Sequence, residues 1–152
     1  MLYFANFADL MSSVRSVQVQ RGVGTSSAGT ASFAGSVNLE TMPVAQARAG
    51  GDVQLQAGSF GSRRISAGAY TGLLANGLAV QARLGGLQTN GYRRHSGVAG
   101  GTAFLGAGWF GSRDVVKLTA LAGRLADTLS YVGATAAELA QDPRFNPLDP
   151  YE

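Results

Sequence analysis

The chain has 152 residues, of which 22 are glycine, none is cysteine, 45% are hydrophobic and only 14% are charged. That charged fraction is well below the ~25% of an ordinary soluble domain, and the formal net charge is only +3. These figures exclude a disulfide scaffold and a cysteine-ligated metal site, exclude a disordered polar chain, and argue against nucleic-acid binding. The sequence has no run of about 18 apolar residues, so we expect no transmembrane helix. The first residues lack the basic segment of a signal peptide, so we expect none at Met1.

Two short strands are predicted in the N-terminal third of the chain. After a short helix or turn over residues 6–14, valines alternate with polar residues up to residue 20, which is typical of a strand. A stretch rich in Gly, Ser, Thr and Ala over residues 22–36 predicts a loop. A second strand is expected over residues 37–41, and the residues from Pro43 to Gly51 are expected to form a connector.

Five further strands are predicted in the following part of the chain, where apolar and polar residues alternate. They cover residues 52–57, 64–70, 78–84, 102–110 and 116–124. Asn76 and Gly77, a pair that favours a hairpin turn, lie between the second and the third of these strands. Each strand has one weakly apolar face and one polar or small face, which is typical of a transmembrane β-barrel. A soluble β-sandwich or barrel stays an alternative, although its buried face is usually richer in Val, Ile and Leu.

The C-terminal part of the chain predicts a short helix followed by a loop. Thr135 and Glu138 have the spacing of a capping box, so a helix is expected to begin there and to end near Gln141. Pro143 follows, and the residue before a proline rarely continues a helix.

No catalytic group is recognised in the sequence. His95, the single histidine, lies beside Arg93 and Arg94 in a predicted loop and has no partner at metal-ligand spacing. The glycines near Gly22 fit neither the dinucleotide-binding nor the phosphate-loop pattern. We therefore expect no enzyme activity, no cofactor and no bound metal. Arg93, Arg94 and His95 are candidate contacts for an anionic ligand, and the alternative is that they are ordinary exposed loop residues.

The order of several motifs resembles TonB-dependent outer-membrane receptors. Residues 17–22 read Val-Gln-Val-Gln-Arg-Gly, a small-residue loop follows, and residues 35–41 read Gly-Ser-Val-Asn-Leu-Glu-Thr. This order resembles the last part of the plug domain of that family. Gly-Ser-Phe-Gly at 58–61 looks like the end of the first barrel strand, and Asn-Gly-Tyr-Arg at 90–93 looks like an early extracellular loop. Residues 138–152 resemble a later loop of ferric-siderophore-type members.

The resemblance implies an all-β fold, namely a partial antiparallel transmembrane β-barrel of about five strands preceded by the C-terminal part of a plug domain. It implies plug residues at 1–45, a connector at 46–51, barrel strands at 52–131 and a truncated extracellular loop with a short helix at 132–152. The plug motif comprises Arg21, Gly22, Gly24, Gly35 and Asn38. Arg21 is expected either to pair with a barrel carboxylate or to be a solvated charge.

In such a barrel, polar side chains line the lumen and apolar side chains meet lipid. The residues expected to face the lumen are Gln54, Gln56, Gln81, Arg83 and Lys117. Those expected to face lipid are Val53, Leu55, Ile65, Leu78, Val80, Leu84, Val116 and Leu118.

The function that the resemblance implies is active uptake of a scarce ligand, such as a ferric siderophore, across the bacterial outer membrane. The implied partners are outer-membrane lipid, the small ligand and the TonB protein, which contacts a segment with no match in this chain. A plugged barrel of about 22 strands, each of roughly ten residues, is longer than this chain, so we expect a fragment. Two alternatives stay open: a self-contained Gly-rich structural or adhesive β-protein, and a small outer-membrane pore.

Overall fold

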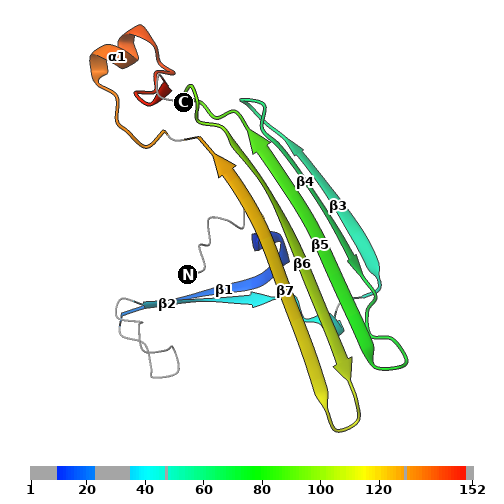
Figure 1. Ribbon diagram of the computed structural model, residues 1–152. Helices are drawn as coiled ribbons and strands as arrows, with labels where there is room; N and C mark the ends of the chain where they lie inside the picture. The colour runs from blue at the N-terminus through cyan, green and yellow to red at the C-terminus, as the bar shows by residue number, and fades with distance from the viewer. Residues whose placement is uncertain (1–9, 23–34, 47, 129, 150–152) are drawn as a thin grey trace.

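The computed structural model describes residues 10–22, 35–46, 48–128 and 130–149 (Figure 1). The elements in chain order are η2 (Leu10–Ser13), β1 (Val14–Arg21), β2 (Gly35–Thr41), η4 (Val44–Gln46), β3 (Gly50–Ala57), β4 (Arg63–Tyr70), β5 (Leu78–Thr89), β6 (Val98–Phe110), β7 (Val115–Asp127) and α1 (Ala136–Gln141). The strands form antiparallel sheets of two and five strands. The prediction of a mostly β chain with two N-terminal and five later strands is therefore confirmed. The capping box at Thr135 and Glu138 is also confirmed, because it begins α1.

Strands β1 and β2 form a two-stranded hairpin, in which Val17 pairs with Leu39 and Val19 with Val37. The hairpin depends on a glycine at its first β2 position. Gly35 has φ +147°, and a Cβ atom there would collide with the carbonyl oxygen of Gln20. Glycine is therefore the residue that allows the two backbones to approach at this end of the hairpin.

Strands β3 to β7 form one sheet in sequence order, with each strand antiparallel to the next. The sheet curves along its length, as Figure 1 shows. Strands β5, β6 and β7 have 12, 13 and 13 residues, which corresponds to about 40 Å each at ~3.4 Å per residue. Strands β3 and β7 are the two edges, and neither pairs on its outer side with another strand in the described part of the chain.

Strands β5 and β6 are longer than predicted. Strand β5 continues to Thr89 and β6 begins at Val98. The added stretches contain glycines, and Gly86 of β5 pairs with Gly101 of β6. Glycine has no side chain, so it cannot contribute to an alternating apolar and polar pattern. The sequence pattern therefore does not extend to these strand ends, although the backbone hydrogen bonds between the strands continue through them.

The turn between β4 and β5 lies where Asn76 and Gly77 predict it. Gly77 has φ +77°, whereas Asn76 is not among the residues with positive φ. The amide of Gly77 donates to the carbonyl of Leu74 at 2.9 Å, and the amide of Leu74 donates to the carbonyl of Leu78 at 2.8 Å. This is a type I turn followed by a left-handed glycine, not the two-residue turn that an Asn-Gly pair commonly forms. The side chain of Asn76 instead accepts a hydrogen bond from the amide of Leu78 at 3.1 Å.

The five-stranded sheet has one polar and one apolar face, because its strands pair in register. Gln54 pairs with Ser66, and Ser66 pairs with Gly85, so every second residue of each strand lies on the same face. The polar face carries Asp52, Gln54, Gln56, Arg64, Ser66, Tyr70, Gln81, Arg83, Thr102, Lys117 and Thr119. The same face also carries the buried ring of Phe104 and, mostly toward the two ends of the strands, the apolar residues Leu87, Val98, Phe110, Val115, Leu121 and Leu125. The apolar face carries Val53, Leu55, Ile65, Leu78, Val80, Leu84, Leu105, Trp109, Val116 and Leu118, and its polar residues Arg63, Gln88 and Arg124 lie toward one end of the strands. The two sets predicted for opposite faces are therefore on opposite faces.

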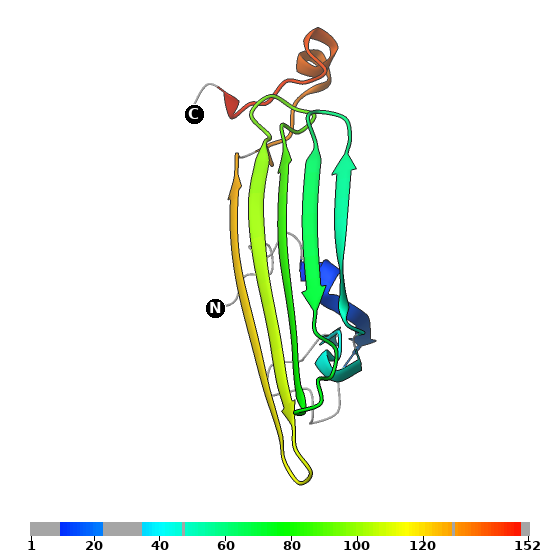
Figure 2. The same ribbon diagram turned by 90° about the vertical axis from the view of Figure 1, so that its right-hand side faces the viewer.

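The β1–β2 hairpin lies on the polar side of the sheet (Figures 1 and 2). Gln81 of β5 donates from its side chain to the carbonyl of Met42, just after β2, at 2.8 Å. Arg64 of β4 donates to the hydroxyl of Ser12 in η2. No element among the described residues covers the apolar face in this way. Apart from the half-buried Val80, its large side chains are between 36% exposed (Leu78) and 73% exposed (Leu55). This is the reverse of a one-sided water-soluble sheet, which buries its apolar face.

Among the residues that the structure describes, no helix is long and apolar enough to cross a membrane.

Candidate functional site

The centre of the polar face is occupied by a charged cluster that spans β3, β4 and β5. The Arg83 guanidinium donates to both carboxylate oxygens of Asp52, at 2.6 and 3.0 Å. It also donates to the hydroxyl of Tyr70 at 2.7 Å and to that of Ser66 at 3.4 Å. The Tyr70 hydroxyl in turn donates to the Asp52 carboxylate. The Arg83 side chain is only 10% exposed, and a charge so far from water needs this set of partners.

Gly68 allows this cluster to lie flat on the sheet. Gly68 of β4 pairs with Asp52 on one side and with Arg83 on the other. A Cβ atom at Gly68 would lie 2.7 Å from Arg83 Nη2 and 2.9 Å from Asp52 Oδ1. The missing side chain therefore leaves the space in which the two charges meet. The sequence predicted that Arg83 faces the polar side, but it did not predict Asp52 as its partner, because the two residues meet across an intervening strand.

The predicted plug motif is only partly within the described residues. Arg21 ends β1 opposite Gly35, and Gly22 follows with φ +86°. Asn38 lies on β2 opposite Gln18, and Gly24 lies outside the described residues. Arg21 is exposed, and no carboxylate of the described residues forms an ion pair with it. The Arg21 side chain is thus exposed within this part of the chain, and its pairing with a barrel carboxylate stays a prediction.

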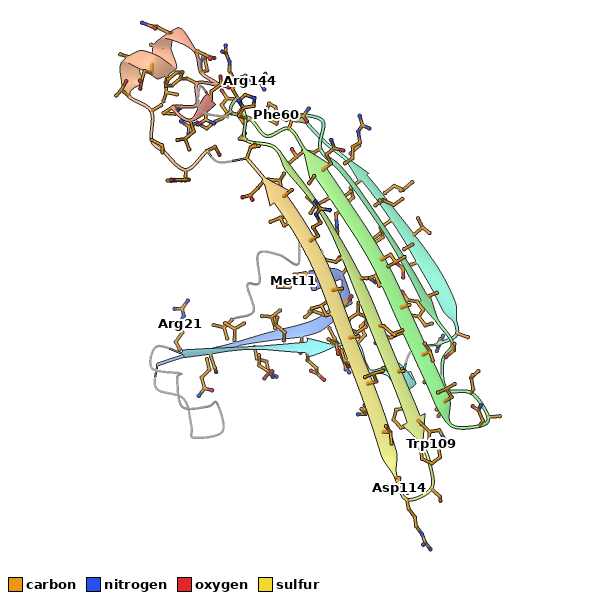
Figure 3. All side chains as sticks on the ribbon, in the orientation of Figure 1. Met11, Arg21, Phe60, Trp109, Asp114 and Arg144 are labelled. Atoms are coloured by element: carbon orange, nitrogen blue, oxygen red, sulfur yellow. The ribbon has the colours of Figure 1, made fainter. Side chains whose placement is uncertain are left out.

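Aromatic side chains lie at both ends of the sheet. Phe60, in the turn between β3 and β4, contacts Tyr92 edge to face, with ring centroids 5.4 Å apart. Trp109 lies at the opposite end, near the turn between β6 and β7 (Figure 3). Phe60 has φ +58°, a conformation that is uncommon for a bulky residue. Aromatic rings thus lie at both ends of the strands.

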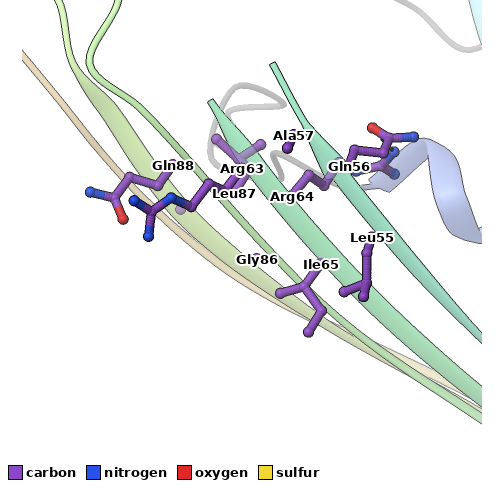
Figure 4. A pocket seen from close by; sticks show the side chains of 10 residues that line it. Leu55, Gln56, Ala57, Arg63, Arg64, Ile65, Gly86, Leu87 and Gln88 are labelled. Carbon is purple, nitrogen blue, oxygen red and sulfur yellow. Dashed lines mark hydrogen bonds between the residues drawn. The ribbon is translucent and has the colours of Figure 1, made fainter. Parts of the chain in front are cut away.

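A hollow interrupts the apolar side chains near the ends of β3, β4 and β5. Leu55 and Ile65 pair across β3 and β4 and lie side by side beside Gly86 (Figure 4). An added Cβ at Gly86 would reach only to 3.9 Å from Ile65. The hollow therefore includes the space left by a glycine on the sheet surface. Its polar lining residues are Gln56, Arg63, Arg64 and Gln88.

The basic residues predicted as ligand contacts lie in the loop between β5 and β6, and the structure joins them to the C-terminal segment. Arg93 donates from its guanidinium to the carbonyls of Ser130 and Val132, both at 2.8 Å. It also donates to the carbonyl of Phe145 at 3.0 Å. Three backbone carbonyls therefore occupy N–H groups of the Arg93 guanidinium that could otherwise bind a ligand.

Arg94 and His95 face carboxylates of the same C-terminal segment. Arg94 pairs with Asp142 at 3.1 Å, and its side chain is 60% exposed. The imidazole of His95 contacts the carboxylate of Asp149, and the His95 side chain is 51% exposed. His95 has φ +43°, so the loop backbone turns sharply where the ring meets its partner.

Two residues complete this contact that belong to the motif at 138–152 but were not among the candidate ligand contacts. Asn146 is fully buried and donates from its side-chain amide to the carbonyl of Arg94 at 2.8 Å and to that of His95 at 3.3 Å. Arg144 donates from Nε to the carbonyl of Tyr92 at 2.7 Å. Their position in a Pro-rich segment gives little indication of these contacts, because the partners lie about fifty residues earlier in the chain.

No group of three or more His, Asp or Glu side chains suited to a metal ion occurs among the described residues. In comparisons with known proteins, no family model and no curated protein matches the chain.

Proposed function

We propose that the chain is part of a TonB-dependent outer-membrane receptor, with the β1–β2 hairpin as the end of the plug and β3 to β7 as the first strands of a transmembrane β-barrel. One observation carries this proposal: the sheet exposes its apolar face and turns its polar face toward the hairpin. A barrel in lipid needs this arrangement, because its outer surface meets hydrocarbon and its interior is polar. A soluble sheet with the same alternation would cover its apolar face.

The strand dimensions and edges support the same proposal. Transmembrane β-strands need about 9–11 tilted residues to cross the hydrocarbon region. Strands β5, β6 and β7 exceed that length, whereas β3 and β4 have eight residues each. Aromatic rings at the strand ends are typical of the two membrane interfaces. In the proposed receptor the outer edges of β3 and β7 pair with further strands, because open sheet edges are not tolerated in lipid.

In this proposal the receptor takes up a scarce ligand, for which a ferric siderophore is the leading candidate, and TonB supplies the energy. The ligand class comes from the resemblance of residues 138–152 to a loop of ferric-siderophore-type receptors. The Asp52–Arg83 cluster then has a structural role, since it stiffens the barrel wall beside the docked plug segment. Ligand contacts belong to the loops at the end of the sheet that carries Phe60 and Arg144 (Figure 3).

The proposal is tested in lipid vesicles, with this segment joined to the flanking strands that its coding sequence supplies, by labelling single cysteines along β5 with a polarity-sensitive fluorophore. The chain has no native cysteine, so each label reports one position. Ala82→Cys and Leu84→Cys lie on the apolar face, and Gln81→Cys and Gly85→Cys are their matched neighbours on the polar face. We expect blue-shifted emission and quenching by lipid-borne quenchers for the first pair only. Labels without this alternation would refute insertion as a barrel wall.

The receptor is distinguished from the two alternative functions by the coding sequence on both sides of this segment. The proposal predicts an upstream plug with a TonB-contact segment and further alternating strands downstream. A complete barrel of few strands without a plug would favour a pore. Flanking sequence without any outer-membrane strands would favour a structural or adhesive β-protein.

A further inference from the structure

The strongest unexplained feature of the molecule is the contact between the β5–β6 loop, residues 90–97, and the C-terminal segment, residues 130–149. We call these two segments together the clasp. Hydrogen bonds run in both directions across it. Arg93 of the loop donates to three carbonyls of the segment, and Arg144 and Asn146 of the segment donate to carbonyls of the loop. The amide of Arg94 donates to the carbonyl of Arg144 at 2.8 Å, which adds a backbone bond.

The clasp has a buried centre and an exposed rim. Asn146 is fully buried, and its amide group joins the carbonyls of two consecutive loop residues, Arg94 and His95. A buried amide that lost these acceptors would carry the full cost of desolvation. The ion pair of Arg94 with Asp142 and the contact of His95 with Asp149 have exposed basic side chains, 60% and 51%, and half-buried carboxylates, so water and salt weaken them and they contribute less. Arg93 and Asn146 therefore hold the clasp closed.

The clasp is separate from the sheet in its bonding. The hydrogen bonds described for the C-terminal segment run within the segment or to loop residues 92–95. Within the segment, α1 has its own capping box, in which Thr135 and Glu138 satisfy each other's backbone amides. The segment can thus leave the loop without breaking any strand pairing described above.

We infer that the clasp is a cooperative conformational device, which opens and closes while the five-stranded sheet stays intact. In the closed state, the side chains of Arg94 and His95 are paired with the carboxylates of Asp142 and Asp149. Opening releases the two basic side chains and the two carboxylates together. The clasp thereby controls when the basic residues at this end of the sheet are available to an anion. This inference is independent of the proposed function, because it concerns contacts within the chain.

Disulfide trapping in the full chain tests the clasp, in detergent micelles under mild oxidation. The pair His95→Cys and Asp149→Cys replaces two side chains in contact. The control pair is His95→Cys and Asp114→Cys, because Asp114 lies at the opposite end of the sheet (Figure 3). We expect the first pair to form a disulfide readily and the control pair to form none within the chain. Equal trapping in both pairs would overturn the inference.

The role of the two holding residues is tested by adding Arg93→Ala or Asn146→Asp to the trapping pair. Each change removes at least one hydrogen bond across the clasp, so we expect the trapping rate to fall about fivefold or more. Arg113→Ala, in the turn between β6 and β7, is the matched control and should leave the rate unchanged. Trp109, the single tryptophan, reports the far end of the sheet by its emission. An unchanged trapping rate in Arg93→Ala and Asn146→Asp would refute the role of these two residues. A changed Trp109 emission in the same variants would refute the inference that the clasp opens while the sheet stays intact.

Discussion

The Asp52–Arg83 pair is expected to contribute to stability as a coupled unit, which a double-mutant cycle measures. Replacing Asp52 with Ala leaves the nearly buried Arg83 guanidinium with only the Tyr70 and Ser66 hydroxyls as partners. Breaking a fully buried pair costs about 3–5 kcal/mol. Because the Asp52 side chain is 32% exposed, water replaces part of the lost interaction, and we expect about 2 kcal/mol for Asp52→Ala.

The cycle compares Asp52→Ala, Arg83→Met and the double variant. Removing Arg83 as well eliminates the uncompensated charge, so the double variant should lose less than the sum of the single losses, with a coupling of about 1–2 kcal/mol. The free energies of unfolding are measured by denaturant titration in micelles, followed by circular dichroism of the sheet. The exposed pair of Arg94 and Asp142 is the control, with an expected coupling below about 1 kcal/mol. Losses at Asp52 and Arg83 that add within about 0.5 kcal/mol would refute the reasoning.

Two further predictions concern local structure. Gly77→Ala forces a side chain into a left-handed backbone position, and its Cβ would also collide with the carbonyl of Phe110. We therefore expect the free energy of unfolding to fall by at least about 1 kcal/mol. The control is Gly133→Ala, whose Cβ meets no other atom, and an equal denaturation midpoint in the two variants would contradict the prediction. The pKa of Glu138 is lowered, first by the backbone amide of Thr135 and then by its hydroxyl. A lowered carboxyl pKa stabilises the folded form at neutral pH, and this contribution disappears as the pH falls through the lowered pKa. Amide hydrogen exchange at residues 136–141, corrected for the intrinsic rate, should therefore be faster in acid than at neutral pH. Glu138→Gln should abolish this pH dependence. Equal protection from exchange in acid and at neutral pH in the unchanged chain would contradict the prediction.

The sequence predicted those features that depend on local patterns. Alternation of apolar and polar residues placed Gln54 and Leu55 on opposite faces, as the strand register shows, and the spacing of Thr135 and Glu138 placed the helix start. These features could be predicted because each depends on residues that are close in the chain. The extension of β5 and β6 through Gly86 and Gly101 could not be, since glycine carries no sign of facing in or out.

The contacts that define the candidate sites depend on strand register and on distant segments. Asp52 and Arg83 meet because β3 and β5 both pair with β4, with Gly68 between them, and no local pattern specifies that alignment. Arg93 was predicted as an exposed loop residue or a ligand contact, and the structure places its guanidinium against carbonyls near residues 130 and 145. A residue with several donors can satisfy distant carbonyls as well as a ligand, so composition does not distinguish the two roles.

The central claim, that lipid surrounds the apolar face, is tested most directly by placing one arginine on each face of β7, with the segment in its complete barrel in vesicles. Leu118 and Thr119 are adjacent and both exposed, but Leu118 lies on the apolar face and Thr119 on the polar face. In water, both substitutions would be surface changes within about 0.5 kcal/mol. In a lipid bilayer we expect Leu118→Arg to lose up to about 2–4 kcal/mol of folding free energy, and Thr119→Arg to lose much less. Equal small losses for both variants, or a larger loss for Thr119→Arg, would contradict the account.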